Sequence, residues 1–166
     1  MKCCKVILIG ILAVITILAA GTYLAGQEIF YVNRTASAPC GIYMRCLDDT
    51  LKYDDYVVVA LDRDVAALKE GYLLLKQVKG FPGDVYIVDN RGVTIRGQLF
   101  PVKPARQLPQ LKKGAYIVPK DSCLLLNGTD ESFDSRYLGP MKRDRIRAKV
   151  RMLLPYGPLA RLFAKG

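Results

Sequence analysis

The feature that most constrains this chain is an uncharged, mainly apolar run from Val6 to Gln27. A helix rises about 1.5 Å per residue, so roughly 20 residues cross the hydrocarbon core of a bilayer, which is about 30 Å thick. Lys2 and Lys5 precede the run, and positive charge on that side favours a cytoplasmic N-terminus. The run therefore predicts one transmembrane anchor.

This anchor predicts three regions: a cytoplasmic N-terminus over residues 1–5, a transmembrane segment over 6–27 and an exported domain over 28–166. A cleaved signal peptide is the alternative, because residues 19–21 are small. The run is nevertheless longer than the apolar region of a typical signal peptide, which spans about 7–15 residues.

Short apolar or alternating segments, broken by Gly, Pro and Asp, follow the anchor and predict strands. We expect these strands over residues 56–61, 72–78, 84–89, 92–97, 115–119, 123–127 and 145–153. Residues 63–71 are expected to form one helical turn, 99–114 a surface excursion and 158–165 a short amphipathic helix. The predicted fold class is a mainly β, antiparallel domain with short helices, preceded by one transmembrane helix.

The formal net charge of +10 allows a nucleic-acid or a membrane partner. The basic residues are scattered apart from one patch over residues 141–152, and no nucleic-acid-binding motif is present. We therefore expect no nucleic-acid partner, and interpret the charge as a surface close to the anionic headgroups of a lipid bilayer.

Histidine is missing from the whole chain, which excludes a Ser-His-Asp triad, a Cys-His pair and the common zinc-hydrolase sites. The five cysteines do not form two CxxC pairs, so a metal cluster is not expected. Cys40, Cys46 and Cys123 fall in the exported domain, where one disulfide and one free thiol are an open alternative.

Ser37 lies in the turn-forming segment SAPCGIY, soon after the predicted anchor. Such a cluster of Ser, Pro and Gly most simply marks a turn. If Ser37 is instead a nucleophile, a group other than imidazole has to accept its proton.

Lys76 is the candidate for that group. In a strand, side chains alternate between faces, so Lys76 shares one face with Leu74 and Val78. Burial among apolar side chains disfavours the ammonium and lowers the pKa of a lysine, which suits a general base. The alternative is a lysine whose amine reaches water along the sheet edge.

A third segment, NGTDESFDSRYLGP over residues 127–140, carries hydroxyl and charged groups. Asp134 and Arg136 are close enough to form an ion pair that braces a loop. Ser132 and Ser135 offer hydroxyls, one of which can orient a neutral lysine. The simpler interpretation is a polar loop with a structural ion pair.

In this order, the three segments resemble the signal peptidase I family of membrane-anchored Ser/Lys proteases. The matching motifs are SAP at Ser37, KQVKGFPGD from Lys76 and SFDSRYLG from Ser132. Gln77 stands where the family usually has arginine, and residues 126–128 depart from its Gly-Asp-Asn. The S-x-P-x-G-x-Y turn, small size and single span look like the TraF-type branch, which serves plasmid conjugation.

The resemblance implies roles for individual residues. Ser37 is the expected nucleophile and Lys76 the general base, with Ser132 holding the lysine amine. The Ser37 backbone N–H and the Thr35 hydroxyl are expected to form the oxyanion hole. Asp134 and Arg136 support the loop, and Leu73, Leu74 and Leu75 are expected to bind the substrate. No metal or organic cofactor is expected.

On this resemblance, the chain is an endopeptidase of the bacterial inner membrane with its catalytic domain in the periplasm. Its expected substrate is a membrane-borne precursor, most simply the pilin of a type IV secretion system, which it cleaves or cyclises. Other transfer-apparatus proteins are further candidate partners. The alternatives are a general signal peptidase acting on secreted preproteins, and an inactive structural component of the transfer complex.

Overall fold

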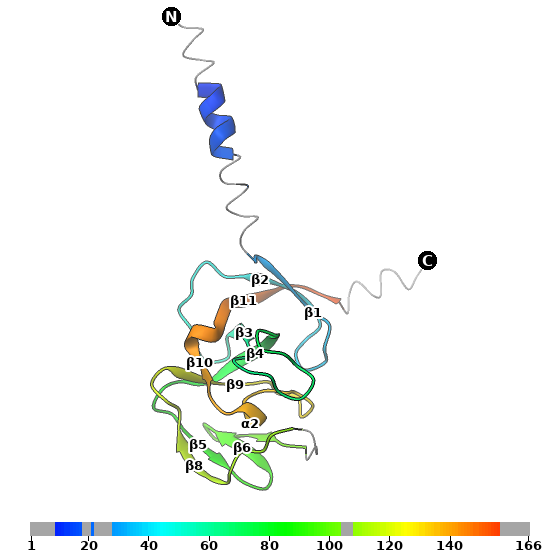
Figure 1. Cartoon of the computed structure of the whole chain (residues 1–166), viewed down its shortest axis with the longest axis vertical. Coiled ribbons are helices and arrows are strands. Elements are labelled where there is room, and N and C mark those ends of the chain that lie inside the picture. Colours follow the sequence, from blue (N-terminus) through cyan, green and yellow to red (C-terminus); the bar gives the residue numbers. More distant parts are fainter. Residues whose placement is uncertain (1–8, 18–20, 22–27, 104–107, 157–166) are drawn as a thin grey trace, which may run out of the picture.

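The computed structural model describes residues 9–17, 21, 28–103 and 108–156. These residues form two antiparallel sheets, with strand orders β1-β2-β11-β3-β4-β9-β10 and β7-β6-β5-β8 (Figure 1). The strands are β1 (Phe30–Asn33), β2 (Gly41–Arg45), β3 (Tyr56–Ala60), β4 (Leu73–Gly80), β5 (Val85–Val88), β6 (Gly92–Ile95), β7 (Gln98–Pro101), β8 (Gly114–Ile117), β9 (Ser122–Leu126), β10 (Met141–Lys142) and β11 (Ile146–Pro155). The short helices are α2 (Ser135–Leu138) and the 3-10 helix η1 (Arg143–Arg145). The fold is mainly β, as the sequence predicts.

Strand β9 holds the two sheets together because all five of its residues are buried. Cys123 and Leu125 pack into a cluster within the larger sheet, while Leu124 and Leu126 pack against the smaller sheet. A continuous apolar strand is the pattern expected when both faces are covered. Its position beside β4 places the third sequence segment next to Lys76.

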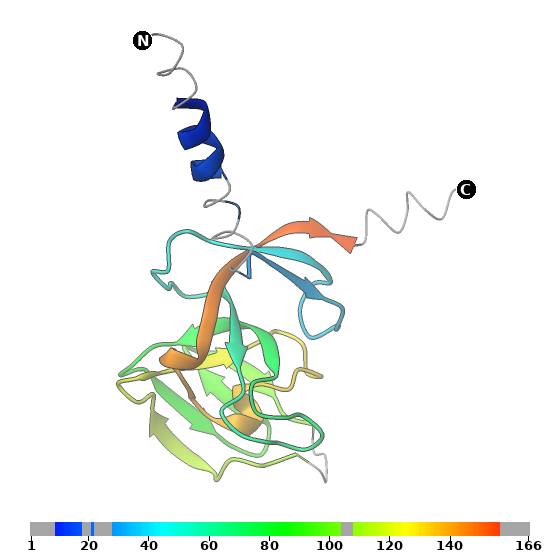
Figure 2. The same ribbon diagram turned by 45° about the horizontal axis from the view of Figure 1, so that its top comes forward.

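The two sheets lie at opposite ends of the domain. The β1, β2 and β11 strands of the larger sheet lie at the end nearer the helical residues 9–17, and the β5, β6 and β8 strands of the smaller sheet lie at the far end (Figures 1 and 2). Strands β3, β4 and β9 run between them, so the segments around Ser37, Lys76 and Ser132 converge near the middle of the domain.

The seven predicted strands are present, as β3, β4, β5, β6, β8, β9 and β11, with ends displaced by a few residues. The predicted helical turn over 63–71 is wrong. Asp64 accepts hydrogen bonds from the Glu70 backbone N–H and the Lys69 amine, and Val65 and Leu68 form an isolated β-bridge. This network closes a loop in place of a helix.

The predicted surface excursion over 99–114 is wrong at its start, because β7 pairs with β6 and buries Phe100. Strands β1, β2, β7 and β10, helix α2 and the 3-10 helix η1 were not predicted. The predicted helix over 158–165 lies outside the described residues.

Of the predicted anchor over 6–27, the structure describes residues 9–17 and 21, and these are helical. In the described ranges, no helix has the length and apolar character needed to cross a membrane. The predicted cytoplasmic residues 1–5 are not among those described.

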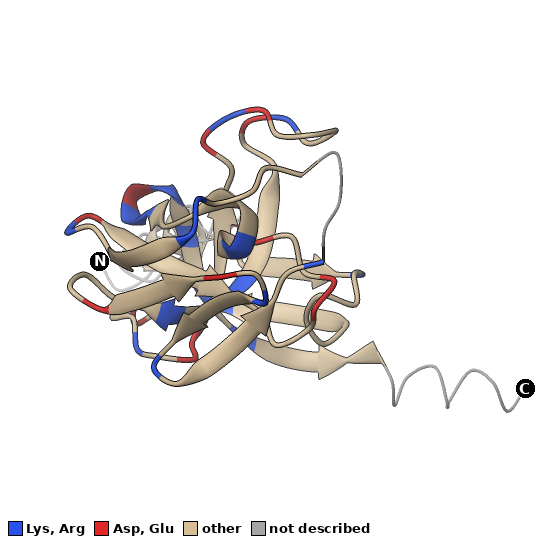
Figure 3. Cartoon of the chain, turned by 90° about the horizontal axis from the view of Figure 1, so that it is seen from below, with Lys and Arg blue, Asp and Glu red and all other residues tan. Residues whose placement is uncertain are grey.

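Within the described domain, Cys40, Cys46 and Cys123 are free thiols. Viewed from below, Lys and Arg are interspersed with Asp and Glu, mainly in loops (Figure 3).

Candidate active site

Ser37 lies in a turn between β1 and β2, which are paired as a hairpin. Asn33, the last residue of β1, is buried and binds this turn through its side chain. Its Nδ2 donates to the carbonyl oxygens of Thr35 and Ala38 at 3.0 Å and of Pro39 at 3.2 Å. The turn therefore wraps around one carboxamide group.

The Thr35 and Ser37 hydroxyls are hydrogen-bonded to each other, with their oxygens 3.0 Å apart. The Thr35 hydroxyl also donates to Asn33 Oδ1 at 2.9 Å, and the Thr35 backbone N–H donates to the same oxygen at 3.2 Å. Ser37 is half-buried and lines a cavity of the described domain.

Lys76 lies in the middle of β4, opposite Val57 of β3. Its face of the strand is buried, with Leu74 and Val78 on either side, and Lys76 itself is only 2% exposed. This burial lowers the pKa of Lys76 to about 8. Asp134 opposes the shift, and Arg136 adds a smaller lowering. Because burial favours the neutral amine, Lys76 is suited to accept a proton near neutral pH.

The Lys76 amine donates a hydrogen bond to Ser132 Oγ at 3.0 Å, and both side chains are buried. The loop that carries Ser132 directly follows strand β9. The last residue of β9, Leu126, pairs with Gln77 of β4, so this loop begins beside Lys76. The structure thus brings Ser132 into contact with Lys76, as the sequence led us to expect. The catalytic roles of both residues stay predictions.

Asp134 and Arg136 form an ion pair whose side chains are completely buried, with Arg136 Nη2 and Asp134 Oδ2 2.8 Å apart. The Arg136 guanidinium also donates to the carbonyl oxygens of Pro101, Asn127 and Thr129. Every polar atom of a buried charged pair needs such partners to offset its desolvation. This pair therefore fixes the path of the loop.

That loop also reaches the Ser37 turn. The Thr129 hydroxyl donates to the Ser37 backbone carbonyl at 3.3 Å, while Arg136 binds the Thr129 carbonyl at 2.6 Å. Asp134 and Arg136 consequently act on the Ser37 turn through Thr129, without contacting Ser37 themselves.

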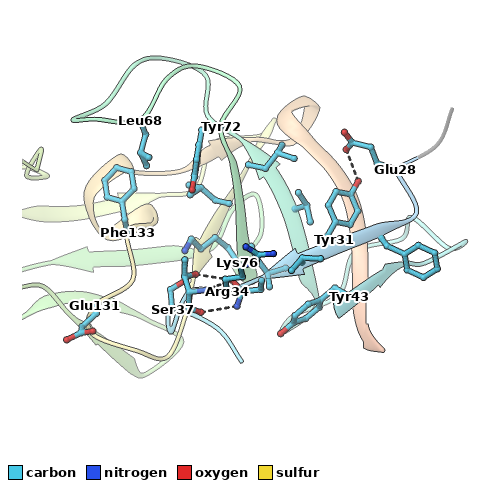
Figure 4. Close-up of a pocket in the computed structure, with 18 of the residues that line it drawn as sticks. Glu28, Tyr31, Arg34, Ser37, Tyr43, Leu68, Tyr72, Lys76, Glu131 and Phe133 are labelled. Atoms are coloured by element: carbon cyan, nitrogen blue, oxygen red, sulfur yellow. Dashed lines mark hydrogen bonds between the residues drawn. The ribbon is translucent and has the colours of Figure 1, made fainter. Parts of the chain in front are cut away.

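Ser37 and Lys76 line one cavity of about 980 Å³. In Figure 4 both lie toward the same end of this cavity, near Phe133 and Leu68, and Tyr31 and Glu28 mark the other end. In the described structure, the Ser37 hydroxyl is bonded to Thr35 and the Lys76 amine to Ser132. Contacts between a nucleophile and its base are often completed only when substrate binds.

Leu73, Leu74 and Leu75 line the same cavity. These residues pair with β3 on one side, whereas β9 pairs with β4 only from Gln77 onward. Among the described strands, none pairs with the second edge of Leu73–Leu75. An extended peptide can add to such an edge as a further strand.

Three residues near the site were not assigned a role from the sequence: Asn33, Asn127 and Thr129. The Asn127 side chain accepts from the Gln77 N–H and donates to the Leu75 carbonyl, at 3.1 and 3.0 Å. It thereby continues the β4–β9 pairing across Lys76. The Asn-x-Thr spacing after a strand is a signal for a side-chain-closed turn and points to Asn33.

Comparison with known proteins identifies the family of the chain. The model of the family described as signal peptidase, peptidase S26, matches residues 4–155. The chain therefore belongs to the S26 signal peptidase family.

Within that family, the chain is similar to two proteins from Escherichia coli, each called plasmid transfer protein TraF. One is 28% identical over 91% of this chain and 94% of the relative, and the other is 30% identical over 84% and 89%. A solved structure of a signal peptidase I from Enterococcus faecalis matches 61% of this chain and 97% of that one, at 17% identity and a TM-score of 0.42.

Proposed function

We propose that the chain is a serine endopeptidase in which Ser37 is the nucleophile and Lys76 the general base. The observation that carries the proposal is Lys76, a residue that is 2% exposed, whose pKa is lowered to about 8 and which lines the same cavity as Ser37. A lysine in a purely structural role is more favourably placed with its ammonium in water.

In the proposed reaction, Ser37 Oγ attacks the scissile carbonyl carbon while its proton passes to the neutral Lys76 amine. The ammonium then gives this proton to the leaving amine as the C–N bond breaks, which leaves an acyl ester on Ser37. Water attacks the ester after losing a proton to Lys76, and that proton returns to Ser37 Oγ when the ester bond breaks. If a peptide amine attacks in place of water, the product is ligated.

The negative oxygen of each tetrahedral intermediate requires hydrogen-bond donors that are already in place. The Ser37 backbone N–H and the Thr35 hydroxyl are the proposed donors. The Thr35 oxygen lies 3.0 Å from Ser37 Oγ, so rotation of its hydroxyl away from Asn33 would bring the proton to an oxyanion formed at Ser37. Residue Ser132 then has the separate task of holding the lysine amine.

The proposed substrate is an exported, membrane-borne precursor, most simply the pilin subunit of a conjugative transfer apparatus. The similarity to two plasmid transfer proteins supports this choice. The edge at Leu73–Leu75 pairs with none of the described strands on its second side, where Asn127 binds only the Leu75 carbonyl, so it offers a place for an extended segment. An inner-membrane anchor with the domain in the periplasm would confine enzyme and precursor to one surface and raise their effective concentration. Other transfer proteins are further proposed partners.

The test is to express the chain with the conjugative pilin precursor, or separately with a secretory preprotein, and to measure product masses. Ser37→Ala and Lys76→Met are expected to abolish processing while the protein stays folded. Lys79→Met is the matched control, because Lys79 lies on the same strand and pairs with Asp54.

Each outcome has a clear meaning. Processing of the pilin alone supports the proposal, and processing of the preprotein alone would favour a general signal peptidase. Normal processing by Lys76→Met would refute the Ser/Lys assignment, and failure of the wild type on both substrates would leave a structural role in the transfer complex. A wild-type product one water lighter than the cleaved linear peptide indicates cyclisation.

A further inference from the structure

Asn33 is only 8% exposed, and its carboxamide uses its whole hydrogen-bonding capacity within the Ser37 turn. The two Nδ2 hydrogens are shared among the carbonyl oxygens of Thr35, Ala38 and Pro39. Oδ1 accepts from the Thr35 backbone N–H and from the Thr35 hydroxyl. An amide offers two donor hydrogens and two strong acceptor positions, so Asn33 is saturated by this one turn.

The orientation of this carboxamide follows from its partners. If the nitrogen and oxygen were exchanged, the NH₂ group would face the Thr35 N–H, and the oxygen would face three carbonyl oxygens. In each of these contacts two donors or two acceptors would then face each other, and polar groups without a partner are unfavourable inside a folded turn. The hydrogen bonds therefore assign Oδ1 to the Thr35 side.

This assignment sets the direction of the hydroxyl chain. Because the single hydroxyl proton of Thr35 goes to Asn33 Oδ1, Thr35 Oγ1 can only accept from Ser37. In the free protein, the Ser37 proton accordingly points toward Thr35. To react, Ser37 has to turn its proton toward Lys76, and Thr35 has to release Asn33 and donate to the oxyanion.

We propose that Asn33 is a positioning residue that acts through Thr35. It holds Thr35 so that the hydroxyls of Thr35 and Ser37 are in place. Its Oδ1 accepts the hydrogen bond of the Thr35 hydroxyl until an oxyanion replaces it as the acceptor. This inference rests on the proposed Ser37–Lys76 peptidase. Displacing a catalytic group by about 1 Å can cost roughly 100-fold in rate, so the position of Thr35 has a large effect.

The test is a double-mutant cycle on the full chain in detergent micelles, with the pilin precursor as substrate. Asn33→Ala is expected to lower kcat about 100-fold with KM within about threefold of wild type. Thr35→Val, which keeps the side-chain shape, is expected to lower kcat about 100- to 1000-fold. The double variant should fall no more than about threefold below Thr35→Val, because Asn33 acts through the group already lost. Asn90→Ala is the control, since Asn90 is an exposed turn residue.

A kcat for Asn33→Ala within about threefold of wild type would overturn the proposal, as would losses that simply multiply in the double variant. If Asn33→Ala does not fold, Asn33→Asp has nearly the same size, lacks the donors to the three carbonyls and is expected to show the same loss of kcat.

A second measurement does not depend on activity. Hydrogen exchange by NMR on the Ser37→Ala chain should show slow exchange of the Asn33 side-chain amide beside fast exchange at Asn90. Equal rates at the two residues would refute the geometry. If Asn33 exchanges slowly but the wild type processes no precursor, the contacts of Asn33 are confirmed. The proposed peptidase activity and the positioning role of Asn33 in it then both fail.

Discussion

Titration of Lys76 should control the pH dependence of the enzyme. Burial lowers the pKa of this amine from 10.5 to about 8. At pH 7 a group with a pKa of about 8 is roughly 9% neutral, whereas one with a pKa of 10.5 is about 0.03% neutral. The folded environment thus raises the fraction of the reactive form about 300-fold, which corresponds to about 3 kcal/mol.

The assay is the pH profile of kcat/KM for precursor cleavage between pH 5.5 and 10, because this ratio reports groups of the free enzyme. We expect about a tenfold rise per pH unit below pH 7.5 and a plateau above about pH 8.5. The substrate should lack histidine and carry a blocked amino terminus, so that its own groups do not titrate in this range. Lys79→Met should show the same profile, since Lys79 lies on the opposite face of β4.

Two results would refute the reasoning. A profile that is flat between pH 6 and 9 would mean that no group with a pKa near 8 has to be neutral. A rise that continues beyond pH 9.5 would mean that the strand does not lower the pKa of Lys76 to the extent that its burial implies.

Three further predictions concern the scaffold. Thr129→Val should lower kcat about tenfold by removing the hydrogen bond to the Ser37 carbonyl, and Thr129→Ser should restore it. Arg136→Met should lower the free energy of unfolding in urea by about 3–5 kcal/mol, because Asp134 is left buried and unpaired, whereas Lys103→Met on the surface should change it by less than about 0.5 kcal/mol. Lys76→Met should raise the free energy of unfolding by up to about 3 kcal/mol at pH 7. The unfolded chain binds more protons between pH 8 and 10.5, so this gain should shrink as pH rises through that window.

The sequence carried enough local information to predict the central strands. In β4, alternation places Leu74, Lys76 and Val78 on one face, and this is the face that is buried. Strand β9 is a continuous apolar run, the pattern of a strand covered on both faces. These patterns identify the strands because burial dictates the residue types directly.

Strands β1 and β2 were missed for a physical reason. Each has only four or five residues, and both adjoin the Ser37 turn, so turn-forming residues dominate the local signal. They become strands because they pair with each other and β2 pairs with β11, whose sequence lies more than a hundred residues away. Such a pairing partner cannot be identified from the local pattern of either strand.

In the candidate site, too, the features that depend on a local sequence pattern were predictable, and those that depend on distant groups were not. The position of Lys76 on a buried face followed from alternation, whereas its contact with Ser132 was implied by family resemblance. Asn33 had no assigned role because its contacts are with three carbonyl oxygens that converge only in the folded turn. Backbone groups are the same in every residue, so their convergence leaves little trace in the sequence.

The buried ion pair of Asp134 and Arg136 adds little net charge beside the buried Lys76. A rigid loop beside Lys76 needs strong hydrogen bonds, and charged groups form the strongest ones. A lone carboxylate would raise the pKa of Lys76 and keep it protonated, whereas Arg136 and Asp134 act on that pKa in opposite directions. Because the two charges offset each other, burial remains the largest cause of the lowered pKa, and the loop gains a fully bonded guanidinium. Any change that removes one charge of the pair should therefore alter the titration of Lys76 as well as the stability of the loop.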